Sequence, residues 1–132
     1  MYEFLPHTAD VRIRVTAHSQ EDLFTEALLA LCEYVKSSGA GEPRERRVET
    51  TAGNATDLLV DFLNEALWRI HAFGEIYQRV EFERCSATEI TATLHGRAFD
   101  SMEEDVKAVT YHEADVQMTG DGHWTTLLVL DI

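Results

Sequence analysis

The last nine residues of the sequence, Trp124 to Ile132, most strongly limit the folds open to this chain. They contain an uncharged run of β-branched and aliphatic residues, Thr125 to Leu130, which follows a glycine-containing turn at 120–122. Such a run predicts a β-strand, and because it does not alternate with polar residues, the strand should be covered on both faces. The sequence ends at Asp131 and Ile132. We therefore expect a side-chain carboxylate and the terminal carboxylate to be held together at one end of a sheet.

Two amphipathic helices are predicted ahead of this strand. The first should begin after the N-cap Ser19 and end near Val35, and the second should begin after the N-cap Asn54 and end before Gly74. Both place apolar residues along one face at helical spacing, and the second has the wider apolar face. Its apolar residues are Leu58, Leu59, Phe62, Leu63, Ala66, Leu67, Ile70 and Phe73.

The remaining periodic segments predict strands. Residues 11–17 alternate between apolar and polar side chains, which is typical of a strand with one solvated face. Further strands are expected at 44–51, 79–86, 89–97 and 106–118. The late strands follow one another without helices between them, which argues against a doubly wound parallel sheet. The sequence therefore predicts one α+β domain over residues 1–132, a mixed, largely antiparallel sheet covered on one face by two helices.

The chain is strongly acidic, with 24 Asp and Glu residues against 11 Lys and Arg residues and a formal net charge of −13. Such a surface repels phosphates, which disfavours direct nucleic-acid binding and favours basic proteins or divalent cations. No stretch has the length and hydrophobicity of a membrane span, and no signal peptide is visible. Cys32 and Cys85 lie within helix and strand patterns, as expected for buried free thiols. We expect a cytoplasmic protein.

Asp10 is the residue that could complete a site at the chain end. It lies just before the strand at 11–17. If that strand and the last strand are antiparallel neighbours, Asp10 lies beside Asp131 and the carboxylate of Ile132. Three anionic groups this close repel one another unless a cation lies between them, and oxygen ligands favour calcium, magnesium or manganese over zinc. The alternative is that Asp10 is a turn residue that bonds its own backbone.

Three other side chains have both a functional and a structural interpretation. Lys107 follows the acidic loop 100–105 and could form a surface ion pair with it. His112 could be a structural histidine on the face of a strand. Glu65 lies on an acidic helix face that is ordinarily solvated, but it could also approach the proposed cation. The sequence has no nucleophile elbow, phosphate loop, HExxH motif or defined acid–base pair, so no catalytic residue is predicted.

Four motifs, taken together and in this order, resemble the archease family. They are His7-Thr8-Ala9-Asp10, the stretch LLVDFLNEAL at 58–67, the stretch VKAVTYH at 106–112, and Leu130-Asp131-Ile132. The resemblance covers essentially the whole chain, and the last two motifs are specific in combination. It implies a small α+β protein that is not itself an enzyme. Such a protein assists an RtcB-type RNA ligase, which joins 2′,3′-cyclic or 3′-phosphate ends to 5′-hydroxyl ends in tRNA splicing and RNA repair.

The resemblance also implies roles for individual residues. The metal site of the family falls on Asp10, Asp131 and the terminal carboxylate of Ile132, with calcium as the expected ion. Lys107 matches a lysine of the family, and Lys107, Glu65 and His7 become candidates for ligase activation. In this interpretation the protein promotes guanylylation of the ligase by GTP and allows it to turn over repeatedly.

Two rival functions remain open at this point. One is a metal-dependent phosphoester hydrolase that uses the same carboxylates. The other is a chaperone-like protein, which would expose a contiguous apolar patch.

Overall fold

The structure is a computed structural model, and it describes residues 1–6 and 10–132. Its helices are α1 (Gln20–Val35) and α2 (Ala55–Phe73). Its strands are β1 (Tyr2–Leu5), β2 (Val11–Ala17), β3 (Ser37–Ser38), β4 (Pro43–Thr51), β5 (Glu75–Cys85), β6 (Glu89–Ala98), β7 (Ser101–Met102), β8 (Ala108–Thr110), β9 (Gln117–Met118) and β10 (Trp124–Asp131). The predicted α+β class is confirmed. Within the described ranges, no helix is long and apolar enough to cross a membrane.

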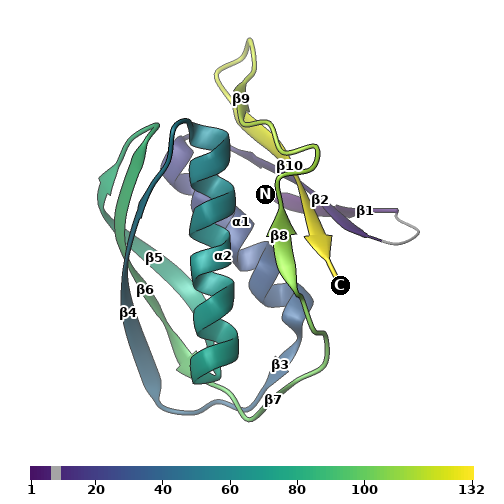
Figure 1. The fold of residues 1–132 in the computed structure, drawn as a ribbon, viewed down its shortest axis with the longest axis vertical. Helices are drawn as coiled ribbons and strands as arrows, with labels where there is room; N and C mark the ends of the chain where they lie inside the picture. Colours follow the sequence, from purple (N-terminus) through teal and green to yellow (C-terminus); the bar gives the residue numbers. More distant parts are fainter. Residues whose placement is uncertain (7–9) are drawn as a thin grey trace.

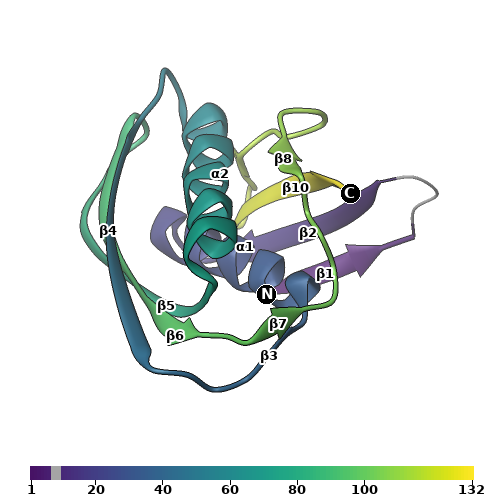
Figure 2. The same ribbon diagram turned by 60° about the horizontal axis from the view of Figure 1, so that its bottom comes forward.

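The strands pair antiparallel, as predicted, but they are divided among separate sheets. One sheet has the order β1-β2-β10-β8 with β9 paired to β10, a second has the order β4-β6-β5, and β3 pairs with β7. Figures 1 and 2 show the two helices between the first two sheets, and each helix contacts strands of both. The helices are therefore covered on two sides, which agrees with the wide arc of buried residues on each of them.

Both helices begin where the sequence predicts. The Ser19 and Asn54 side chains each accept a hydrogen bond from the backbone N–H three residues further on, at 3.1 and 2.9 Å. Gly74 follows α2 in the left-handed region with φ of 64°, where the absence of a Cβ removes the steric penalty. Lys36 has the same role after α1 with φ of 52°, and no glycine in the sequence marks this helix end.

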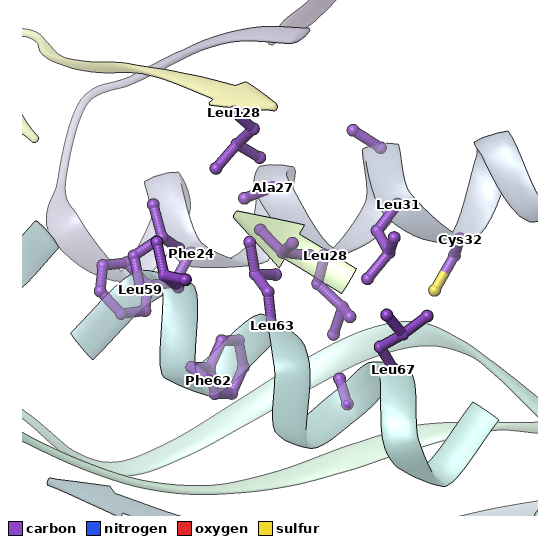
Figure 3. Close-up of a cluster of buried hydrophobic side chains, with 14 of the residues drawn as sticks. Phe24, Ala27, Leu28, Leu31, Cys32, Leu59, Phe62, Leu63, Leu67 and Leu128 are labelled. Carbon is purple, nitrogen blue, oxygen red and sulfur yellow. The ribbon is translucent and has the colours of Figure 1, made fainter. Parts of the chain in front are cut away.

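The hydrophobic core lies between the helices and beneath β10. Figure 3 shows a cluster of buried side chains that includes Phe24, Leu28, Leu31, Leu59, Phe62, Leu63, Leu67 and Leu128. The ring centroids of Phe24 and Phe62 lie 5.8 Å apart. In β10, Leu128, Val129 and Leu130 are all buried although neighbours in a strand point to opposite faces. This confirms that the last strand is covered on both faces at these residues.

The predicted strand at 106–118 is wrong in its extent. The structure has a short strand at each end of this range, β8 and β9, and a turn between them in which the Ala114 N–H donates to the Tyr111 carbonyl at 3.2 Å. Glu113 has a φ of 59°, which ends extended pairing at this point. His112 lies in this turn and is exposed, so its predicted place on a strand face is also wrong.

Candidate functional site

The strands β2 and β10 are antiparallel neighbours, which is the arrangement that the predicted cation site requires. Val11 pairs with Leu130 at the end of the ladder. Asp10 precedes Val11 and Asp131 follows Leu130, so both residues lie directly beyond this pair, and both are exposed. Ile132 follows Asp131 and is 39 % exposed. The fold therefore brings together the three residues that the sequence analysis assigned to one site, at the solvent-exposed end of the sheet.

Lys107 reaches the same end of β10 from its other edge. Its backbone N–H donates to the Asp131 carbonyl at 2.8 Å, and the next residue, Ala108, is the register partner of Asp131. Figure 1 shows the carboxyl terminus beside β8 and β2. The alternative ion pair of Lys107 with the acidic loop is absent from the described part of the chain, where Lys36 instead lies 4.0 Å from Glu104. The exposed end of this sheet thus carries two Asp residues and one Lys residue.

The donor groups at this end determine which ion could bind. Among residues 1–6 and 10–132, no three His, Cys, Asp or Glu side chains are arranged to hold a metal ion. The terminal carboxylate of Ile132 stays the predicted third anionic donor beside Asp10 and Asp131. This donor set consists of oxygens, which fits a hard divalent cation, and exposure to solvent allows water to fill the remaining coordination positions.

Asn64, for which the sequence predicts no role, connects α2 to this region. Its Nδ2 donates to the Val109 carbonyl at 2.8 Å, and the Val109 N–H donates to its Oδ1 at 2.9 Å. Val109 is the register partner of Leu130 in β10. The local signal for this role is a polar amide next to the apolar face of a helix, because a half-buried amide requires hydrogen-bond partners.

Two candidates for ligase activation remain, His7 and Glu65. His7 lies outside the described residues. The carboxylate of Glu65 pairs with Arg69 at 2.8 Å, one turn further along α2, and Glu65 lines a groove between α2 and β4. Within the described residues, Glu65 forms no cluster with Asp10 and Asp131 that could hold a metal ion.

Tyr111 adds a second contact between α2 and the segment after β8. Its hydroxyl donates a hydrogen bond to the Asp61 carboxylate. This bond and the negative charge of Asp61 raise the pKa of Tyr111 to about 12. Two residues of α2, Asp61 and Asn64, thus hold the segment that follows Lys107.

Comparisons with known proteins agree over the full length of the chain. The family model described as the Archease protein family matches residues 2–132. A protein archease from Methanopyrus kandleri is 32 % identical over 139 residues, covering 99 % of both chains. Another from Pyrococcus abyssi is 31 % identical over 139 residues, covering 99 % of this chain and 98 % of the relative.

Two solved structures share the fold. The solution structure of Methanobacterium thermoautotrophicum protein 1598 has a TM-score of 0.72 and 23 % identity, and the match covers 99 % of this chain and 98 % of that one. The crystal structure of an archease from Thermotoga maritima, described as a possible chaperone, has a TM-score of 0.71 and 24 % identity, with 97 % and 94 % covered.

Proposed function

Since this chain belongs to the archease family, we propose that it activates an RtcB-type RNA ligase that joins 2′,3′-cyclic or 3′-phosphate ends to 5′-hydroxyl ends in tRNA splicing and RNA repair. In this proposal the protein is a cytoplasmic accessory factor and not an enzyme. It promotes guanylylation of the ligase by GTP and allows the ligase to turn over repeatedly. The net charge of −13 favours contact with the ligase rather than with RNA.

The adjacency of β2 and β10 supports the proposal, because Asp10 and Asp131 lie directly beyond the register pair Val11–Leu130, and the terminal carboxylate of Ile132 follows. We call these three groups the acidic tip. The tip is proposed to bind a divalent cation, with calcium as the first candidate, and such an ion would reduce the repulsion among three carboxylates. Since the tip is exposed, it can enter the nucleotide- and metal-binding cleft of the ligase.

Lys107 supplies the positive charge next to the acidic tip. Its backbone is fixed by the hydrogen bond to the Asp131 carbonyl, and its ammonium group can approach a phosphate in the cleft as a flexible point charge. In this mechanism Asp10 and Asp131 position the cation, and Lys107 contacts the nucleotide during guanylylation.

A guanylylation assay with an RtcB-type ligase, GTP and manganese tests the role of the tip. Asp10→Asn and Asp131→Asn should each lower the activated rate by at least about tenfold, as expected for a weakened metal site. Glu103→Gln, which removes an exposed carboxylate elsewhere, should activate like the wild type. Full activation by both tip variants would overturn the proposal.

A metal-dependent phosphoester hydrolase is the rival function. It predicts that this protein alone turns over its substrate, and the same mixtures prepared without the ligase test this.

The exposed aromatic residues of α2 favour a chaperone-like protein as a second candidate function. Trp68 is 58 % exposed and Phe73 is 43 % exposed, and their ring centroids lie 5.5 Å apart. The Thermotoga maritima relative is described as a possible chaperone. Suppression of the aggregation of an unrelated unfolded protein, lost in Trp68→Ala, would support this function. Equal behaviour of Trp68→Ala and the wild type would exclude a role of this patch.

A further inference from the structure

A groove of about 700 Å³ runs between α2 and β4. Its lining consists of Glu49, Thr50, Thr51, Asp61, Asn64, Glu65 and Trp68. We propose that this groove, called here the α2–β4 groove, binds a basic segment of a partner protein. An arginine or lysine side chain of that segment would lie against the Trp68 ring and among the carboxylates of the lining.

The charges in and around the groove favour a cationic guest. Three of the seven lining residues carry carboxylates, and none is cationic. Two arginines compete from outside the lining, since Arg47 pairs with Glu49 at 2.5 Å and Arg69 pairs with Glu65 at 2.8 Å. Asp61 accepts a hydrogen bond from the Tyr111 hydroxyl, which adds no positive charge to the lining. The lining therefore keeps a net negative potential that attracts a basic segment.

Trp68 supplies an aromatic surface for the guest. The Arg69 guanidinium lies 5.5 Å from the centroid of the Trp68 ring while it pairs with Glu65. Arg46 similarly lies 4.0 Å from the ring centroid of the neighbouring Phe73. The protein thus already combines an aromatic ring, a carboxylate and a guanidinium on this side of α2. A guest arginine would form the same combination on a ring that is largely exposed to solvent.

Thr50 provides an independent indication of a ligand. Its side chain is on the buried side of β4 with 7 % exposure, and its Oγ1 has no hydrogen-bond partner among the described residues. A buried hydroxyl without a partner is unfavourable, because it has lost its hydrogen bonds to water. Since Thr50 lines the groove, an N–H donor of the guest is the partner that the proposal assigns to this oxygen.

The overall charge distinguishes a basic partner from a second copy of this chain. Two molecules with a net charge of −13 repel each other, and the lining of the groove has the same sign. A basic segment is attracted both by the molecule as a whole and by the groove. This assignment does not depend on the identity of the ligase or on the acidic tip.

Amide NMR spectra of the full chain, titrated with the peptide acetyl-Gly-Arg-Gly-Arg-Gly-amide, test the assignment. The shifts should concentrate at residues 49–51 and 61–68 and at the indole N–H of Trp68, whereas the indole N–H of Trp124 should stay fixed. The same peptide with citrulline in place of arginine has no charge and should shift these resonances much less. Shifts spread over the whole acidic surface, or equal shifts with both peptides, would overturn the proposal.

Variants make the test specific to the groove. Trp68→Ala and Asp61→Asn should each weaken peptide binding by about tenfold, which corresponds to about 1.4 kcal/mol. Asn keeps a carbonyl that can accept the Tyr111 hydrogen bond. Glu103→Gln is the matched control because it removes one negative charge outside the groove. If Glu103→Gln weakens binding as much as Asp61→Asn, the attraction is general and there is no specific site.

Peptide binding is measured without the ligase. A negative result for the groove therefore says nothing about the acidic tip, and a negative result for the tip in the guanylylation assay says nothing about the groove.

Discussion

Asn64 of α2 and Val109 of β8 are joined by two hydrogen bonds, 2.8 Å from Nδ2 to the Val109 carbonyl and 2.9 Å from the Val109 N–H to Oδ1. The side-chain amide satisfies the outer edge of β8 in the way that a neighbouring strand would. Val109 is 2 % exposed, so water does not readily replace these bonds. The position of β8, and of Lys107 directly before it, is therefore set by a residue of α2.

Asn64→Ala should lower the free energy of unfolding by about 1–3 kcal/mol, because it leaves the buried backbone groups of Val109 without partners. Urea denaturation monitored by circular dichroism measures this change. His112→Ala is a suitable control, since His112 is exposed on the turn after β8, and its effect should stay within about 0.5 kcal/mol. Similar urea midpoints for Asn64→Ala and His112→Ala would mean that the two hydrogen bonds between Asn64 and Val109 contribute nothing to stability.

Because of Glu75, the stability of the native state should depend on pH in the acid range. Its side chain is fully buried, where it accepts hydrogen bonds from Arg46 at 3.0 Å and from the Tyr77 hydroxyl at 2.9 Å. Burial disfavours the charged carboxylate, but these hydrogen bonds and the charges of Arg46 and Arg44 outweigh burial and lower the pKa of Glu75. The ionised group therefore stabilises the native state above the unfolded pKa of about 4.3. This contribution is lost as the pH falls through the lower pKa of the folded state.

Glu75→Gln separates this contribution from general acid unfolding. The wild type should be more stable than the variant at pH 7, and the difference should shrink as the pH falls from about 5 toward 2, because the variant has no carboxylate to protonate. Urea titrations of both proteins at a series of pH values measure the difference. A difference that stays constant across this range would contradict the assignment of a lowered pKa to Glu75.

The elements that the sequence predicts correctly are those with local signals. Ser19 and Asn54 cap the two helices as predicted, because a capping side chain bonds a backbone group only three residues away. The adjacency of β2 and β10 entered the prediction only as the condition for a site at the end of the sheet, and the register pair Val11–Leu130 meets that condition.

The features that the sequence does not predict depend on distant contacts. Asn64 and Val109 are 45 residues apart, and no local pattern connects them. The division of the strands into separate sheets depends on how the helices lie between them. The range 106–118 was predicted as one strand, but the turn at 111–114 and the edge contact with α2 limit β8 to three residues.

Gly96→Ala should be strongly destabilising. Gly96 lies on β6 opposite Tyr77, beside an irregularity in the pairing with β5. A Cβ at this position would lie 1.8 Å from the Ile76 carbonyl oxygen, which no side-chain rotation can relieve. The free energy of unfolding should fall by about 3 kcal/mol or more, since the backbone of β5 must move.

Gly120→Ala is the matched control for this prediction. A Cβ at Gly120 meets nothing within 4 Å, so its effect should stay within about 0.5 kcal/mol. Thermal unfolding of the two variants and the wild type gives the comparison. Equal melting temperatures for Gly96→Ala and Gly120→Ala would show that the backbone of β5 and β6 adapts to a Cβ at position 96 without loss of stability.

The last prediction concerns calcium and the acidic tip. If Asp10, Asp131 and the terminal carboxylate of Ile132 bind the ion only in the folded chain, calcium at 100 times its Kd should stabilise the wild type by about 2.7 kcal/mol, and a chelator should reverse the effect. Asp131→Asn should greatly weaken this response, because it removes one of three anionic donors and leaves the fold of β10 intact. Appending one glycine after Ile132 tests the third donor, since both Asp side chains stay and the terminal carboxylate moves away. If the extended chain responds to calcium like the wild type, the ion does not use the terminal carboxylate, and a site of two Asp side chains alone would have to account for binding.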